Sequence, residues 1–364
     1  TTEGTPHVVG VPSPRESLPP AVPSRAVEAL RPQGTAAGLD WPAAKPQTAE
    51  GYSARRVGDW EIGRWAGLDV VGDPRGHTVH LVFRDENKLY YSCGEQGRIW
   101  SSPELITDSG MHPRLALDRA GTLHLVYCSA RQKNAGDRLP NDGYYLHRRN
   151  GRWSSPLKLN EPGEGALDVR IAVDGSDNVH VIYWAPGTAS REMGQHEQHR
   201  CYYRRKPAAG DDFEKAMCFT NSVAPGPSSH GALAVGPQGE VHVLYRTFQT
   251  APTWAGNLEH RIREKDGTWR GEPAVHRGVY WTDHSLSAWV DAQGTLLVAG
   301  YTFRPLGFQF KCYRLNPMGG GLQEVFAEAE TYGTSSGIVG TPAGDLWLVG
   351  SGNWSLRSRP GKPR

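Results

Sequence analysis

Short apolar segments alternate with polar turns from about residue 55 onward, and one such pattern recurs along the chain. Its clearest copy reads Ala-Leu-Asp-Arg-Ala-Gly-Thr-Leu-His-Leu-Val-Tyr at residues 116–127. Related copies occupy 72–83, 172–183, 234–245, 290–300 and 340–350. Equivalent positions are 44 to 62 residues apart, and no segment shows the 3.6-residue period of an amphipathic helix. A period of this length with several strands per unit is typical of a β-propeller.

Each unit predicts four strands, which we call a to d in chain order. Strand a precedes an Asp-x-x-Gly turn, in which Asp supplies a local hydrogen bond and Gly a positive φ. Strand b contains a repeated histidine, strand c alternates aromatic residues, and strand d carries a tryptophan near its start. The sequence therefore predicts an all-β, six-bladed β-propeller, with seven blades as the alternative count. Residues 57–65, which contain Trp60, are expected to complete the last blade and hide its edge.

The first 54 residues have a different composition. Nine of the 27 prolines lie in residues 1–50, and proline-rich stretches cannot form a helix or a central strand. We interpret residues 1–54 as an extended arm or linker and residues 55–364 as the propeller domain. The arm is either a flexible linker or a segment that docks through apolar residues, such as Val8 and Leu30, on a protein partner or on its own domain.

Composition excludes two classes of partner. The 40 Lys and Arg residues nearly balance the 38 Asp and Glu residues, for a net charge of +2. A nucleic-acid-binding domain should instead show a clustered basic surplus. No apolar run approaches the roughly 20 residues that span a bilayer. The sequence therefore predicts neither nucleic-acid binding nor a membrane span.

The five cysteines form no Cys-x-x-Cys pair. Cys201 and Cys218 stand at the two ends of a predicted hairpin in the third unit, where their side chains are expected to lie opposite each other. We expect either a disulfide, which would suit a secreted protein, or two packed thiols.

The repeat separates scaffold residues from candidates for function. His80, His124, His180 and His242 occupy the same position of strand b, so we interpret them as packing residues that form hydrogen bonds between blades. The connections between strands b and c vary in length, and variable loops on one side of a scaffold are a common place for binding. The starts of the a strands should surround the axis on that same side.

The charged residues at those starts differ from unit to unit, and Tyr183 ends a b strand near them. We predict His112, His230, His284 and Tyr183 as catalytic residues and Arg114, Asp168, Arg170 and Asp283 as substrate-binding residues. The arginines suit a carboxylate or a sulfate, and a histidine near neutral pKa suits proton transfer. A metal site, binding without turnover and a hydrated polar plug stay open as alternatives. The sequence identifies no cofactor and assigns no metal ligand.

The recurrent Asp-x-x-Gly-x-x-His-x-x-Tyr line, with a following Gly-x-Trp strand, resembles bacterial BNR-repeat (sialidase-like) propellers over about residues 55–359. The Ser-x-Asp-x-Gly-x-x-Trp boxes and the Phe-Arg-Ile-Pro motif of sialidases are absent, which argues against a sialidase. The chain also resembles secreted polysaccharide lyases such as ulvan lyases, which use His, Tyr and Arg to eliminate next to a uronate.

This resemblance implies an extracellular or periplasmic protein that binds an anionic polysaccharide or glycan, as a polysaccharide lyase or a glycosidase. The alternative is a non-catalytic glycan- or protein-binding module, or an assembly component, tethered by residues 1–54.

Overall fold

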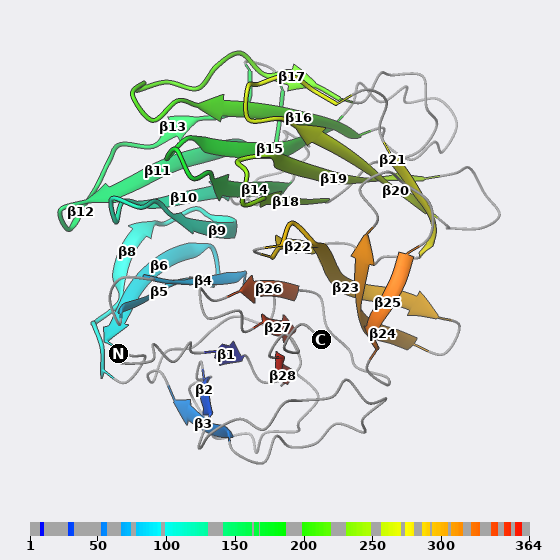
Figure 1. The fold of residues 1–364 in the computed structure, drawn as a ribbon. Coiled ribbons are helices and arrows are strands. Elements are labelled where there is room, and N and C mark those ends of the chain that lie inside the picture. Colours follow the sequence, from blue (N-terminus) through cyan, green and yellow to red (C-terminus); the bar gives the residue numbers. More distant parts are fainter. Residues whose placement is uncertain are drawn as a thin grey trace, which may run out of the picture.

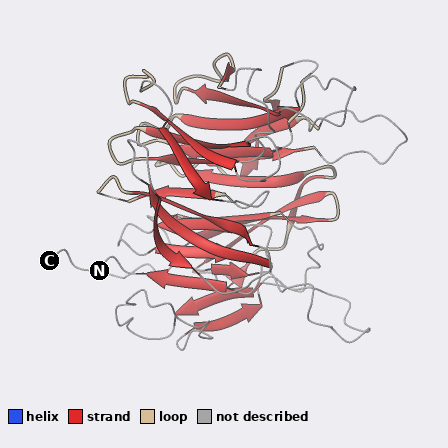
Figure 2. Ribbon diagram, turned by 90° about the vertical axis from the view of Figure 1, so that its right-hand side faces the viewer, coloured by secondary structure: helices blue, strands red, loops and turns tan. Residues whose placement is uncertain are grey.

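A computed structural model describes most of the chain. The described residues are 8–10, 28–32, 52–56, 67–73, 78–95, 99–129, 141–161, 164–166, 168–186, 199–219, 231–248, 256–270, 274–279, 286–291, 293–304, 307–315, 322–327, 336–340, 346–350 and 354–358. They contain strands and turns but no helix, as Figure 2 shows. The prediction of an all-β protein is confirmed.

Successive strands pair antiparallel into sheets, which we name after their first strands. The β4 sheet contains β4 (Leu68–Gly72), β5 (Thr78–Asp85), β6 (Lys88–Glu95), β7 (Ile99–Trp100) and β8 (Glu104–Thr107). The β9 sheet contains β9 (Met111–Leu117), β10 (Leu123–Cys128), β11 (Gly143–Arg149), β12 (Arg152–Trp153) and β13 (Leu157–Lys158). In both, the predicted strand d is split into two short strands that pair with the same strand c.

Three further sheets have the predicted four strands in chain order. The β14 sheet contains β14 (Asp168–Val173), β15 (Val179–Pro186), β16 (His199–Lys206) and β17 (Met217–Cys218). The β18 sheet contains β18 (Gly231–Val235), β19 (Val241–Phe248), β20 (Gly256–Arg263) and β21 (Ala274–Val279). The β22 sheet contains β22 (Ser287–Val290), β23 (Leu296–Arg304), β24 (Gly307–Leu315) and β25 (Leu322–Ala327).

The last repeat forms the β26 sheet, with β26 (Ser336–Gly340), β27 (Leu346–Gly350) and β28 (Trp354–Ser358). The first strands of neighbouring sheets lie side by side, in the order β4, β9, β14, β18, β22 and β26, on the inner side of the molecule in Figure 1. This arrangement brings the starts of the a strands together.

The N-terminal segment also contains strands. β1 (Val8–Gly10), β2 (Glu28–Pro32) and β3 (Tyr52–Arg56) form an antiparallel sheet, the β1 sheet. β1 lies next to β27 and β28 (Figure 1). β3 crosses the expected domain boundary at residues 54 and 55, and the division into an arm and a propeller domain stays a prediction. Residues 57–65 and Trp60, which were expected to close the last blade, lie outside the described residues.

The predicted a–b turn is confirmed in the β9 sheet. The Asp118 carboxylate accepts a hydrogen bond from the Thr122 N–H at 2.6 Å, and Gly121 has a φ of 84°, which a side chain would disfavour.

The repeated histidines link the strands of their own sheets. His180 shares hydrogen bonds with Tyr203 Oη at 2.8 Å and with Asp174 at 3.1 Å. His80 and His124 make the same 2.8 Å bond to Tyr91 and Tyr145. Their scaffold role fits the prediction, but the expected hydrogen bonds between blades are wrong, because both partners belong to one sheet.

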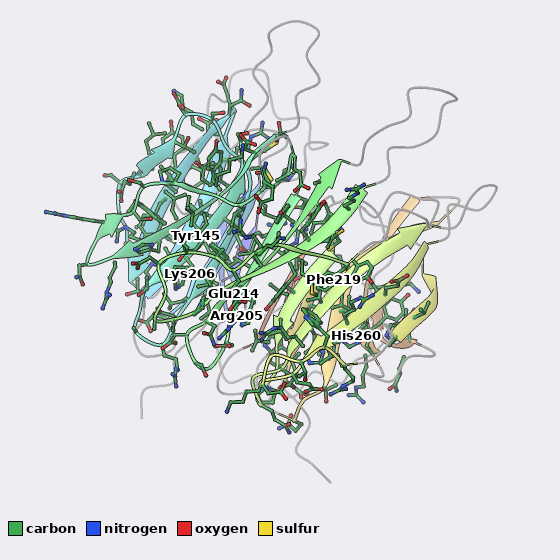
Figure 3. All side chains as sticks on the ribbon, turned by 90° about the horizontal axis from the view of Figure 1, so that it is seen from above. Tyr145, Arg205, Lys206, Glu214, Phe219 and His260 are labelled. Atoms are coloured by element: carbon green, nitrogen blue, oxygen red, sulfur yellow. The ribbon has the colours of Figure 1, made fainter. Side chains whose placement is uncertain are left out.

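Contacts between neighbouring sheets come from aromatic side chains. Trp153 meets the Tyr91 ring edge-on at 5.5 Å, and Trp269 meets Tyr203 at 5.1 Å. Figure 3 shows Tyr145 and Phe219 in this interior and Arg205 beside Glu214, its ion-pair partner at 2.9 Å. The tryptophan of strand d thus packs against the strand c tyrosine of the preceding sheet.

The β18 sheet departs from this pattern. His242 shares a 2.9 Å hydrogen bond with His260, which stands where the other sheets have tyrosine, and the His276 ring lies 6.1 Å from His260. All three imidazoles are buried. In the β22 sheet, Leu297 and Cys312 take the corresponding places, so that position is apolar.

The disulfide expected between Cys201 and Cys218 is absent, because all five cysteines are thiols. Cys218 stands opposite Tyr202, and the Phe219 N–H donates to the Cys201 carbonyl at 2.9 Å. The two cysteines are therefore offset by one residue, and successive side chains of a strand point to opposite faces.

Candidate functional site

One register position of the a strands carries charge in three successive sheets. Asp69 stands opposite Val82, Arg114 opposite Val126 and Arg170 opposite Ile182. These partners all lie two residues after the repeated histidine of strand b. Because β4, β9 and β14 are neighbours, the three charged side chains lie at one level. We call Asp69, Arg114, Asp168 and Arg170 the charge cluster.

Arg170 and Asp168 form the buried half of the charge cluster, with only 6% and 1% of their surfaces exposed. Arg170 Nη1 donates to the Asp168 carboxylate and to the Val169 carbonyl, the latter at 2.9 Å. Burial lowers the pKa of Arg170, and the Asp168 charge opposes that effect. Arg170 Nη2 is buried and has no hydrogen-bond partner among the described residues. A buried donor of this kind is available to an acceptor that a ligand supplies.

Asp69 connects the charge cluster to the next sheet. Its Oδ2 accepts a hydrogen bond from the Leu115 N–H at 2.7 Å. Burial raises the pKa of Asp69, although the Arg114 charge, the backbone N–H groups of Leu115 and Val70, and the Arg170 charge all lower it. Two opposing effects therefore set the pKa of the Asp69 carboxyl, the cost of burial and the attraction of two guanidinium groups.

Cys128 borders the charge cluster on β10. Its thiol is buried, and burial, followed by the Asp168 charge, raises its pKa well above the usual range, against the opposing charges of Arg170 and Arg114. The thiol is thus protonated and unsuited to act as a nucleophile.

His112 sits on a β-bulge at the start of β9. The register shifts between Val126 and Cys128, so that two residues of β9 face one of β10, and His112 has a φ of 53°. A bulge of this kind redirects a side chain and is frequent next to active sites. His112 is partly exposed, two residues before Arg114 in the chain.

Tyr183 lies away from the charge cluster. It stands opposite Val169, whose side chain points to the other face of β14 from Arg170. Its ring is fully buried and stacks on Tyr202 with centroids 5.1 Å apart. Burial raises the pKa of Tyr183 far above its usual value. Its catalytic role stays a prediction that the described contacts do not support.

The remaining predicted residues, His230, Asp283 and His284, lie outside the described residues. Of the predicted set, the structure brings together Arg114, Asp168 and Arg170, with His112 on the same strand as Arg114. Within the described part of the chain, no group of three His, Cys, Asp or Glu side chains is placed to hold a metal ion. The described residues form no helix that could cross a membrane.

The sequence prediction missed Asp69 and Cys128. The signal for Asp69 was present, because it occupies the position of Arg114 and Arg170 in the first repeat. Cys128 follows Tyr127, the last residue of the repeated sequence pattern. Nothing in that pattern predicts that Cys128 is buried beside the charge cluster.

Gly231, next to His230 at the start of β18, is closely packed against its surroundings. A Cβ at Gly231 would lie 2.0 Å from the Leu244 carbonyl oxygen and 2.7 Å from the Trp184 ring. The missing side chain is needed for the packing of the β14 and β18 sheets.

Replacing Gly231 by alanine should therefore destabilise the protein by about 1–3 kcal/mol through overpacking. Urea unfolding measures the change. Gly175→Ala is the matched control, because its Cβ would meet no atom within 4 Å. Equal stability of the two variants would contradict this account of Gly231.

The fold can be compared with known proteins. No protein-family model matches the sequence, and no curated protein matches it significantly. Among solved structures, a PL25 ulvan lyase bound to a glucuronate and sulfated-rhamnose oligosaccharide is similar over 98% of this chain and 89% of its own, with 11% identity and a TM-score of 0.61.

Two other solved structures are also similar. The polysaccharide lyase Uly1 covers 98% of this chain and 88% of its own at 10% identity, with a TM-score of 0.56. An α-L-arabinanase from Penicillium chrysogenum, complexed with arabinobiose, covers 80% and 90% at 12% identity, with a TM-score of 0.54. The chain has the sialidase-like β-propeller fold of these enzymes, and the resemblance predicted from the repeat is confirmed.

Proposed function

We propose that this protein is an extracellular or periplasmic propeller that binds an acidic glycan at Arg114 and Arg170 and cleaves it as a polysaccharide lyase. The observation that carries the proposal is Arg170 Nη2, a buried guanidinium donor with no partner among the described residues. A carboxylate or sulfate would supply the acceptor, because a guanidinium offers paired donors to such groups.

The cluster selects an anion over a neutral sugar. Arg170 donates a hydrogen bond to the buried Asp168 carboxylate, so its guanidinium is fixed before a ligand arrives. A donor fixed in advance costs little ordering free energy on binding. Arg114 adds a second positive charge on the neighbouring strand.

Elimination at a uronate needs three groups. A cation stabilises the carboxylate as charge develops, a base removes the proton from the carbon beside that carboxylate, and an acid protonates the departing glycosidic oxygen. The bond to that oxygen breaks as a carbon–carbon double bond forms. We assign the first role to Arg114 and Arg170 and the base to His112, with His230 and His284 as candidates for the acid.

Comparison with the solved structures supports this choice. The PL25 ulvan lyase was solved with a glucuronate-containing ligand and is similar over nearly the whole chain. The proposal extends to the architecture: the β4 to β26 sheets form six blades, and the β1 sheet packs on the last one or forms a seventh. We also retain residues 55–364 as the catalytic unit.

A panel of polysaccharides tests the function. Polygalacturonate, alginate, hyaluronan, heparin and ulvan are incubated with the protein, with neutral arabinan as the control. A lyase releases products with both new reducing ends and the ultraviolet absorbance of an unsaturated uronate. New reducing ends without that absorbance would indicate a glycosidase. Saturable binding without cleavage would indicate a non-catalytic module, and absence of binding to every acidic polymer would overturn the proposal.

A further inference from the structure

The charge cluster contains as many acidic as basic side chains. It contains two guanidinium groups, from Arg114 and Arg170, and two carboxyl groups, from Asp69 and Asp168. Asp168 forms an ion pair with Arg170, so the Arg170 guanidinium already compensates its charge. Asp69 instead accepts a backbone hydrogen bond from Leu115. The charges of Arg114 and Arg170 act on it electrostatically.

A bound anion would disturb this balance at Asp69. The anion offsets the charge of the two guanidinium groups that lower the pKa of Asp69, and it adds a negative charge beside a carboxylate that burial already disfavours. The groups that face Asp69 are Arg114 and the Leu115 N–H from β9, Arg170 from β14 and the Val70 N–H from its own strand. Asp168 and Cys128 complete the surroundings described for this cluster. None of these other groups offers an easier proton site, because Asp168 is paired and Cys128 is already protonated.

We propose that binding of an anionic group at Arg114 and Arg170 is coupled to the uptake of one proton by Asp69. This inference rests on the proposed function of the site. The protonated carboxyl restores the charge balance of the cluster while the ligand is bound. Asp69 is thus a positioning residue that sets the pH range in which the site accepts its ligand.

Calorimetry measures the proton directly. Sodium glucuronate is titrated into the full chain at mildly acidic pH in MES and in bis-Tris, which differ in ionisation enthalpy. The difference in binding heat gives the number of protons taken up. We expect close to one proton for the unmodified protein and close to none for Asp69→Asn, whose amide oxygen still accepts the Leu115 N–H.

The pH dependence of affinity gives a second readout. With one linked proton, the affinity for glucuronate should fall about tenfold for each unit of pH between the pKa of Asp69 in the free protein and its higher pKa in the complex, and level off above the latter, and Asp69→Asn should remove this slope. A structural role alone would weaken binding equally at all pH values.

Asp177→Asn is the matched control. Like Asp69, Asp177 accepts a hydrogen bond from a backbone N–H of a neighbouring sheet, that of Arg119 at 3.0 Å. Unlike Asp69, it lies in an a–b turn outside the charge cluster. The control should keep the full proton uptake. Saturable binding without proton uptake, or equal uptake by Asp69→Asn, would overturn the coupling and leave the proposed function standing. Failure of glucuronate and sulfate to bind at all would overturn both.

Discussion

Replacing Arg170 by methionine should abolish binding of acidic glycans and lower the stability of the protein by about 3–5 kcal/mol. The loss of binding follows from removal of the buried donor. The loss of stability follows because Asp168, only 1% exposed, keeps its charge without its cation. Urea unfolding and titration with the polysaccharide that binds best measure the two effects.

A double variant separates the two effects. Asp168→Asn with Arg170→Met leaves no uncompensated charge, so it should recover part of the stability and still fail to bind. Arg119→Ala is the control, because the Arg119 side chain is 70% exposed and such an ion pair contributes at most about 1 kcal/mol. Normal glycan affinity in the double variant would remove Arg170 from the site.

Acid should destabilise the protein through its buried histidines. Burial, together with the charges of His242 and His276, lowers the pKa of His260 to about 2, and burial lowers the pKa of His124 to about 4. These pKa values lie below the value of about 6.5 in the unfolded chain. The unfolded state therefore binds more protons than the folded state in this pH range. The stability that depends on these neutral histidines is fully present above about pH 6.5 and is lost as the pH drops toward their folded-state pKa values.

Substitution of His260 by tyrosine should reduce this acid sensitivity. Tyrosine occupies the same position in three other sheets, where it bonds to the repeated histidine. Between about pH 7.5 and pH 5, His260→Tyr should gain about 2 kcal/mol in stability relative to the unmodified protein, because one proton-linked site is removed. Unfolding curves at the two pH values measure it.

The reciprocal variant is the control. Tyr203→His places a histidine pair in the β14 sheet and should increase the acid sensitivity by a similar amount. An identical pH dependence for His260→Tyr and the unmodified protein would show that another group governs acid unfolding.

Repetition made most of the fold predictable. The tight turn and the apolar strand b that follows it locate strands a and b in the six units, and the repeated histidine marks strand b in four of them. The β1 sheet could not be predicted in this way. Its strands share no repeat, and their pairing joins residues as distant as Glu28 and Arg56, which a local pattern does not encode.

Departure from the repeat identified part of the site. Arg114 and Arg170 were found because charge replaces the apolar residues expected in an inner strand. The packing role of Gly231 could not be predicted from the sequence. Its neighbour Trp184 comes from another sheet, and packing between sheets depends on the complete fold rather than on adjacent residues.

The hydrogen bond between the repeated histidine and the strand c tyrosine has a consequence for how this protein can diversify. Two residues separate strands b and c both in the β22 sheet, which lacks that bond, and in the β4 sheet, which has it, and so short a connection fixes the strand register by itself. The β9 and β14 sheets join the same strands through much longer connections, and there the buried bond holds the register from inside.

The long connections are therefore not needed to set the strand register. Insertions, deletions and sequence change within them should leave the blades unchanged. Such a scaffold can acquire new ligand specificity through changes in its loops, and these changes need no compensating mutations in the core.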